Sequence, residues 1–428
     1  MTFSVTRRSL LQGGAAALAL GTLGGGRAFA QAQRLRFLWW GSQERADRTQ
    51  AAISAYKGVA PQTDIVGEFA GWSDYWPRLA TQVAGRNAPD LIQMDYRYIF
   101  EYARRGALMP MDDQIGKALK IEDFGQANID SGRVDGKLYG INLGVNSSAM
   151  VYDPAVWEKA KTEPPKAGMT WEELGERAAA FAKNRARPGI FALADAGGVE
   201  PSFELWLRQN GKSLYTAEGA LGYEPADAEK WFALWADLRE RKACVPADIQ
   251  ALDQLNIETN AITTGKAATA FMHSNQFVGY QKLNKGKLAL APYPRVSAGA
   301  PSGHYLKPSM LISLSANAPA EPALAFANFL VASPEGVKAL GTERGVPASE
   351  SMRALLTPQL ADVEKAMVDY IALITPDVGP LPPSPPPGAG EVAFVQKRIN
   401  EEVGFGRKTA KQAGEDLVKE ASAILKRG

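Results

Sequence analysis

Apolar and polar positions near the start of the chain alternate first with the period of a strand and then with that of a helix. Residues 34–40 place Leu35, Phe37 and Trp39 on one side, which predicts a half-buried strand. The following pattern predicts, in order, a helix at 44–57, a strand at 63–69, a helix capped by Ser73, a strand at 91–94 and a helix at 96–105. Because helices alternate with strands, we expect parallel strands joined by helical crossovers in an α/β lobe.

The pattern changes at residues 137–153, where two short strand-like pieces follow one another without a helix between them. We interpret this segment as the crossing into a second lobe. Beyond it we expect a helix opened by a capping box at 170–173, a helix at 227–240, strands at 267–272 and 310–314, a helix at 333–341 and a final helix at 407–426. Either late strand could return to the first lobe. Residues 380–387 hold six prolines, which predicts a stiff loop.

The first thirty residues are typical of an export signal. Arg7 and Arg8 form a twin-arginine pair, an apolar run follows at 10–23, and the sequence Ala-Phe-Ala ends at Ala30. The run is shorter than the roughly 20 apolar residues that span a bilayer, and no later stretch is apolar enough to do so. We therefore expect cleavage after Ala30 and a periplasmic protein.

Charge and cysteine content exclude several function classes. The signal carries three arginines and no acid, so the remaining chain holds 45 basic and 46 acidic side chains. This balance argues against nucleic acid or an anionic membrane as a partner bound through bulk charge. The single cysteine, Cys244, excludes an internal disulfide and a four-cysteine zinc site, and the two histidines, His273 and His304, lie too far apart for a short metal motif. We expect no metal and no cofactor.

Motifs of covalent catalysis are incomplete in this sequence. Residues 54–57 match S-x-x-K, but they lie in an ordinary amphipathic pattern and no S-D-N or K-T-G follows. Thr264, Gly265 and Lys266 lack the glycine and the hydroxyl residue that complete a phosphate loop. Acidic residues are plentiful enough to supply a pair of glycosidase carboxylates, so an enzyme stays open as an alternative.

Aromatic and planar polar residues follow each of the first three predicted strands. Trp40 comes after the first, Trp72 after the second and Asp95 after the third, whereas the spacing of Trp39 and Trp76 predicts core positions. In a parallel sheet these strand ends form the edge where ligands bind. Sugars suit this combination, because aromatic faces cover their C–H side while amides, acids and arginines bond their hydroxyls.

The sequence resembles the periplasmic solute-binding proteins of carbohydrate ABC transporters, known as extracellular solute-binding protein family 1. The resemblance extends over nearly the whole chain after Ala30. It is carried by Phe37-Leu38-Trp39-Trp40-Gly41, Gly71-Trp72-Ser73-Asp74-Tyr75, residues 79–85, Ala88-Pro89-Asp90-Leu91, residues 265–268 and residues 344–349. The start at Trp39 is similar to that of members that take plant-derived or acidic oligosaccharides, although Ser42-Gln43-Glu44-Arg45 departs from their usual continuation.

This resemblance implies an α/β fold of two discontinuous lobes, the type II-like periplasmic-binding-protein fold, with hinge strands and a cleft between the lobes. It places residues 31–140 and 275–314 in the first lobe and residues 141–274 and 315–428 in the second. The implied protein is a monomer that closes on its ligand, delivers it to the transmembrane subunits of an ABC permease and leaves it chemically unchanged.

Candidate ligand contacts follow from the strand ends and from the transferred fold. They are Trp40, Ser42, Gln43, Arg45, Trp72, Asp95, Asn142, Gly144, Asn146, Gly198, Trp206, His273, Asn275 and Arg344. Ordinary roles compete for several of them: Ser42 and Asp95 could cap helices, Trp206 could be core, and His273 could be structural. Arg45 and Arg344 are the candidates for binding the charge of an acidic ligand.

The sequence thus predicts a periplasmic carbohydrate receptor of an ABC importer. The alternative is a secreted polysaccharide hydrolase or lyase that uses two carboxylates. A third reading keeps the fold and changes the cargo to a polyamine, an iron complex or an organic acid.

Overall fold

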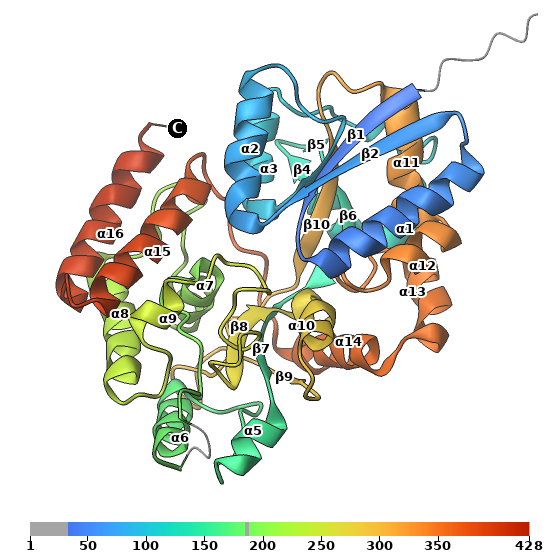
Figure 1. The fold of residues 1–428 in the computed structure, drawn as a ribbon. Coiled ribbons are helices and arrows are strands. Elements are labelled where there is room, and N and C mark those ends of the chain that lie inside the picture. Colours follow the sequence, from blue (N-terminus) through green and yellow to red (C-terminus); the bar gives the residue numbers. More distant parts are fainter. Residues whose placement is uncertain (1–32, 185–187, 428) are drawn as a thin grey trace, which may run out of the picture.

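The computed structural model describes residues 33–184 and 188–427 and contains two separate β-sheets, each with its own helices (Figure 1). The export signal predicted for residues 1–30 lies outside the described residues. The two sheets occupy opposite halves of the molecule in Figure 1, and the chain passes between the halves more than once. This arrangement is the two-lobed α/β architecture that the sequence predicts.

The first sheet has five strands in the order β2-β1-β3-β10-β6. Their bounds are Gln33–Trp40 for β1, Thr63–Ala70 for β2, Leu91–Met94 for β3, Ile141–Asn146 for β6 and Lys307–Leu314 for β10. The strands β1, β2 and β3 are parallel, as predicted, while β10 runs antiparallel to both β3 and β6. The late strand β10 therefore returns to the first half of the molecule.

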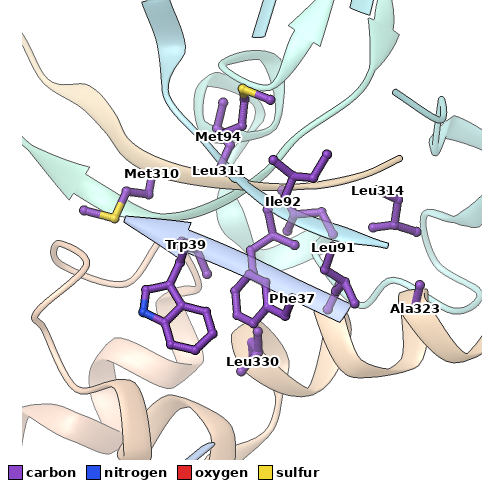
Figure 2. Packing of buried hydrophobic residues seen from close by; sticks show 14 of the residues in the cluster. Phe37, Trp39, Leu91, Ile92, Met94, Met310, Leu311, Leu314, Ala323 and Leu330 are labelled. Carbon is purple, nitrogen blue, oxygen red and sulfur yellow. The ribbon is translucent and has the colours of Figure 1, made fainter. Parts of the chain in front are cut away.

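Helices pack on both faces of the first sheet and enclose one hydrophobic core (Figure 1). They are α1 (Gln43–Val59), α2 (Trp72–Ala84), α3 (Tyr96–Arg104), α11 (Ala320–Ala332), α12 (Pro334–Leu340) and α13 (Glu350–Leu356). The short α4 (Gln126–Asp130) and the hairpin of β4 (Arg133–Val134) and β5 (Lys137–Leu138) pack against the same core. Figure 2 shows Phe37 and Trp39 of β1 packed near Leu330 of α11. Trp39 is fully buried and Trp76 nearly so, which confirms both as core residues.

The second sheet has three antiparallel strands in the order β8-β7-β9. Their bounds are Ser148–Tyr152 for β7, Thr269–His273 for β8 and Ala289–Ala291 for β9. Its helices are α5 (Pro154–Lys159), α6 (Trp171–Asn184), α7 (Glu200–Gln209), α8 (Pro225–Glu240), α9 (Ala247–Gln250), α10 (Phe277–Leu283), α14 (Asp362–Ile374), α15 (Ala389–Gly404) and α16 (Ala410–Leu425). Its largest core cluster includes the fully buried Trp157, Trp231 and Trp235.

Sheets and cores divide the chain differently from the predicted lobes. Residues 141–146, predicted for the second lobe, form β6 and pair with β10 in the first sheet. Helix α11 also belongs to the first core, because its apolar side chains pack against β1. Conversely, α10 and β9 at 277–291 pack with the second sheet. The predicted boundaries at 140, 274 and 314 are therefore corrected: the chain crosses at Ser147, again before β10, and once more between α13 and α14.

Gly144 lies where β6 meets the segment after α12, and the contact leaves no room for a side chain. A Cβ atom at Gly144 would come within 2.7 Å of the Val346 carbonyl oxygen, and Val145 and Val346 exchange backbone hydrogen bonds of 2.8 and 3.0 Å beside it. We expect Gly144→Ala to lower the free energy of unfolding by about 1–3 kcal/mol.

Gly58 is the matched control, because a Cβ atom there has no neighbour within 4 Å and the residue lies in α1. Gly58→Ala should stabilise the protein by about 0.4–1 kcal/mol. Urea denaturation of both variants measures the difference, and equal stabilities would contradict the close contact at Gly144.

Candidate functional site

A cavity lies between the two halves of the molecule, at the carboxyl ends of β1 and β3. The volume of this cavity is about 180 Å³. The first half contributes Trp40, Gly41, Ser42, Arg45, Trp72, Asp95, Arg97, Tyr98, Asn146, Lys307, Ser309, Met310 and Glu343. The second half contributes Gly198, Val199, Glu200, Pro201, Asp253, Leu255, Asn256, Ile257, Asn260, Phe271, Met272, His273, Asn275, Gln276, Tyr280, Tyr293, Ala393 and Phe394.

Indole rings form the wall of the cavity on the side of the first half. Trp40 ends β1 and Trp72 begins α2, and their ring centroids lie 5.2 Å apart in an edge-to-face arrangement. Trp40 is 7% exposed and belongs to the first core, whereas Trp72 is half-buried. Both rings line the cavity, but Trp72 offers the larger free surface. Phe271, Tyr293 and Phe394 line it from the second half.

Ser42 and Asp95 each cap a helix and line the cavity as well. The Ser42 hydroxyl accepts a hydrogen bond of 3.3 Å from the backbone N–H of Arg45, and the Asp95 carboxylate accepts one of 2.9 Å from that of Arg97. The capping roles are therefore real. Through these caps the first turns of α1 and α3 lie beside the cavity, with the Arg45 and Arg97 N–H groups bound to the cap side chains.

The cations that line the cavity are bound to carboxylates of the protein. Arg45 contacts Glu343 at 2.8 Å, Lys307 contacts Asp95 at 3.6 Å, and Arg97 forms an ion pair with Glu200. These groups are at most 11% exposed.

The pKa values of the paired carboxylates follow from this environment. Burial alone would raise the pKa of Asp95, but Lys307 and Arg97 outweigh burial and hold it below its ordinary value. Burial raises the pKa of Glu200, and the guanidinium of Arg97 opposes that shift. The Arg97–Glu200 pair joins α3 to α7 and thus links the two halves across the cavity.

A hydrogen-bonded group lies where β6 ends and the chain crosses to the second half. It consists of Asn146, Asn275 and Ser309. The Asn146 amide nitrogen donates to Asn275 Oδ1 at 2.6 Å and to Ser309 Oγ at 3.0 Å. The Asn275 amide nitrogen donates to the carbonyl of Glu343 at 3.3 Å. Within the described residues, Asn146 Oδ1 is buried and has no partner.

His273 ends β8 and completes this polar wall. Burial, with Lys307 nearby, lowers the pKa of His273 well below its ordinary value, so the ring is neutral at pH 7. Its Nδ1 atom is buried and has no partner among the described residues. His273 therefore lines the cavity with a nitrogen that no described residue engages, and its role as a ligand contact stays a prediction.

The structure brings many of the predicted contact residues together around this one cavity. Those that line it are Trp40, Ser42, Arg45, Trp72, Asp95, Asn146, Gly198, His273 and Asn275. Others lie away from it: Gln43, Asn142, Gly144, Trp206 and Arg344.

Each residue outside the cavity has a structural reason for its position. Gln43 hydrogen-bonds Asp47 on the outer face of α1, and Asn142 donates to Asn128 and Ser131. Gly144 packs against the backbone of 345–346. Trp206 is in the core of the second half, 5.8 Å from the ring of Trp231.

Arg344 is buried in the first half and binds protein groups instead of a ligand. Its Nε donates to Gln93 Oε1 at 2.9 Å and its Nη2 to Thr49 Oγ1 at 2.8 Å. It is 2% exposed, and burial lowers its pKa. The predicted role for Arg344 in binding an acidic ligand is therefore wrong, and Arg45, which does line the cavity, is already paired with Glu343.

The prediction missed five charged residues that line the cavity, Arg97, Glu200, Asp253, Lys307 and Glu343. Arg97 follows the predicted strand end by three residues, so the capping pattern of Asp95 could have indicated it. Glu200 and Asp253 come from segments whose position beside the first half depends on the tertiary fold. Lys307 starts β10, and only its return to the first sheet brings it beside Asp95.

A smaller cavity of about 30 Å³ lies next to the first and shares part of its wall. Asp95, Arg97, Glu200, Pro201 and Lys307 line both. The smaller cavity continues to Tyr96, Glu204, Leu214, Tyr215, Tyr305, Pro382, Pro383 and Pro385. The predicted proline-rich loop therefore closes its outer side.

Two kinds of feature were not found in the part of the chain that the structure describes. Residues 33–184 and 188–427 contain no group of three or more acidic, histidine or cysteine side chains that could hold a metal ion. None of their helices is long and apolar enough to cross a bilayer.

Replacing Arg344 should affect stability and not binding. We expect Arg344→Ala to lower the free energy of unfolding by about 2–4 kcal/mol, because it leaves Gln93 and Thr49 buried without their donor. Arg105→Ala is the control: its side chain is 66% exposed, and its loss should change stability by less than about 0.5 kcal/mol. Thermal and urea unfolding measure both variants; an unaltered stability of Arg344→Ala would contradict the placement.

Acid should destabilise the protein through its two buried histidines. Burial lowers the pKa of His304 to about 3, and its Nε2 accepts a hydrogen bond of 3.3 Å from the Tyr293 N–H. Because the folded pKa lies below the ordinary value of about 6.5, stability is full above that pH and falls as the pH drops toward the folded value. Protonation of each histidine should lower the free energy of unfolding by about 1.4 kcal/mol per pH unit in this range.

Unfolding free energies measured between pH 7 and pH 5 test this expectation. His304→Gln should reduce the slope of stability against pH, and the double variant with His273→Gln should reduce it further. Glu200, whose pKa burial raises to about 7, contributes a slope of the opposite sign in this range and is present in every variant. The slope is the readout, so a general loss of stability in the variants does not affect the result. An unchanged slope in the double variant would show that the histidines are not buried in their neutral form.

Comparison with known proteins places this architecture in a family. A family model described as bacterial extracellular solute-binding protein matches residues 51–367. The first curated relatives match over only 30% of their own length. A probable amino-acid ABC transporter periplasmic-binding protein of Sinorhizobium fredii is 25% identical over 426 residues, which cover 94% of each chain.

Solved structures agree with this match. An extracellular solute-binding protein family 1 structure from Alicyclobacillus acidocaldarius is 31% identical, with a TM-score of 0.64, and the match covers 92% of this chain and 98% of that one. A periplasmic oligogalacturonide binding protein from Yersinia enterocolitica, in complex with saturated digalacturonic acid, has the same fold with a TM-score of 0.83 at 24% identity, covering 92% and 99%. The family match over most of the chain, joined to the two-lobed fold and the cavity between its halves, shows that this chain belongs to the bacterial extracellular solute-binding proteins.

Proposed function

We propose that this protein captures a saccharide in the cavity between its halves and delivers it to an ABC importer. The supporting observation is the cavity itself, whose lining combines indole and phenyl rings with hydrogen-bonding side chains from both halves. Aromatic surface covers the C–H face of a sugar ring, and amide and charged groups bind its hydroxyls. The Yersinia neighbour, whose ligand is an acidic disaccharide, supports a saccharide as the cargo.

The route to this function follows from the sequence and the fold. The twin-arginine signal, cleaved after Ala30, exports the folded chain to the periplasm. The two halves then close on the ligand about the crossing strands, and the permease recognises the closed monomer. The ligand leaves chemically unchanged.

The carboxylates of the cavity favour binding over hydrolysis. Asp95, Glu200 and Glu343 are each held by a cation of the protein, which leaves Asp253 as the one carboxylate of the described cavity wall without an ion pair, whereas a glycosidase needs two carboxyl groups. A hydrolase or lyase predicts new products after long incubation with a polysaccharide. Chromatography that shows such products would replace the binding function with that alternative.

Trp72 provides the sharpest test of the site. We expect Trp72→Ala to weaken saccharide binding by about tenfold or more, because the residue supplies the accessible aromatic surface of the cavity. Isothermal titration calorimetry against mono- and oligosaccharides, with amino acids and polyamines as alternative cargoes, identifies the ligand first and then measures the variant.

Phe69→Ala is the matched control for this substitution. Phe69 is 44% exposed, ends β2 and stacks on Trp39 outside the cavity, so its removal should leave the affinity within about twofold of the original. Equal affinity in the Trp72 and Phe69 variants would place the binding site elsewhere. Binding of an amino acid or polyamine in place of every saccharide would overturn the proposed cargo.

A further inference from the structure

The positive groups around the cavity are not available to an anionic ligand. Arg45, Arg97 and Lys307 are the basic side chains that line it in the described part of the chain, and each is already bound to a buried carboxylate. Four carboxylates, Asp95, Glu200, Asp253 and Glu343, line the same wall, so its three cations leave no excess of positive charge for a ligand carboxylate, and one that displaced a carboxylate of the protein would break a buried ion pair. The displaced side chain would then be a buried charge without a counterion, which is costly.

A further carboxylate makes the cavity less suited to an anion. Asp253 lines it, is 5% exposed, and accepts hydrogen bonds from the Leu255 N–H at 2.8 Å and the Asn260 amide at 2.9 Å. Among residues 33–184 and 188–427 it forms no ion pair within 4.0 Å. Its charge would repel a ligand carboxylate and would attract a hydroxyl donor.

Hydrogen bonds fix the orientation of Asn146 so that its side-chain oxygen is the atom left without a partner among the described residues. The carbonyl of Glu343 can only accept, so Asn275 must present its amide nitrogen there and its oxygen to Asn146. Asn146 therefore turns its nitrogen toward Asn275 and Ser309, which leaves its oxygen free. This oxygen is buried, has no partner among the described residues, and belongs to a side chain that lines the cavity and is 2% exposed.

A buried acceptor without a protein partner needs a donor, which is water when the cavity is empty and which we infer to be a ligand group when it is filled. A hydroxyl group can donate a hydrogen bond to Asn146 Oδ1, whereas an ionised carboxylate is an acceptor only and cannot. The free acceptor and the paired cations are independent observations, and both favour a ligand that is rich in hydroxyls and carries no negative charge.

We propose that the site selects uncharged saccharides over their uronic acid counterparts, and that Asn146 determines this specificity by accepting a hydrogen bond from a ligand hydroxyl. This inference rests on the saccharide function proposed above and specifies its substrate class. It also corrects the expectation that Arg45 and Arg344 bind the charge of an acidic sugar.

Matched pairs of ligands test the preference directly. Each pair consists of a neutral di- to tetrasaccharide of glucose, galactose or mannose and the same oligomer oxidised to the uronic acid. Calorimetry at pH 7, with the chain from Gln31 onward, measures the affinity for each member of the pair. We expect at least one neutral oligomer to bind, with its uronic acid partner about tenfold weaker or more. A uronic acid that binds as tightly as its neutral partner overturns the inference and leaves the saccharide function standing. No binding by any saccharide overturns the proposed function and the inference together.

Asn146→Ala tests the residue that carries the specificity. This substitution should lower the affinity for the neutral ligand by about tenfold, because the ligand hydroxyl loses its hydrogen-bond acceptor. Asn142→Ala is the control from the same strand: Asn142 is equally buried but bonds to Asn128 and Ser131 away from the cavity, so the affinity should not change. A folded Asn146→Ala protein that binds the neutral ligand as tightly as the original overturns this role.

Asp95→Asn tests the paired cations without depending on the Asn146 variant. Asparagine still caps α3, so the fold should persist, but Lys307 loses its counterion. The preference for the neutral member of a pair should then fall about tenfold, mainly through tighter binding of the uronic acid. An unchanged preference would show that pairing of the cations does not exclude acidic ligands.

Discussion

The hydrogen bonds of Asn146 join the segments on which both halves of the molecule depend. Asn146 is the last residue of β6 in the first sheet, and two residues later, at Ser148, the chain begins β7 in the second. Its amide binds Asn275, which follows β8, and Ser309, which lies in β10. Each half buries its own hydrophobic core, so the chain must cross between them where neither core covers it. The crossing strands and the ligand cavity therefore share the same residues.

Local sequence signals were sufficient for the part of the site that lies at strand ends. The alternation at 34–40 and the spacing of the following helices fix β1, β2, β3 and their parallel order, and the carboxyl ends of such strands meet at one edge. Trp40, Trp72 and Asp95 could be predicted for this reason. Their positions in the cavity wall follow from the strands of the first half alone and do not depend on how the second half packs.

Residues far apart in the sequence could not be placed in this way. Arg344 has the fork that suits a carboxylate, but its partners Gln93 and Thr49 lie 251 and 295 positions away and bury it in the first core. The lobe boundaries failed for the same reason, since the pairing of β6 with β10 joins segments more than 150 residues apart. Such contacts depend on the tertiary fold and leave no periodic pattern in the chain.

The ion pair between Arg97 and Glu200 bears on what holds the two halves together. It joins α3 to α7 across the cavity, so in the hinge motion proposed above, opening would separate the charges. Separation would also return both groups to water, and the recovered hydration offsets most of the lost attraction. The pair therefore fixes the geometry of the closed form more than it stabilises closure. By this reasoning the free energy that favours closure must come mainly from the ligand, which contacts both halves at once. A binding protein needs that dependence, because a form that stayed closed when empty would not distinguish cargo from its absence.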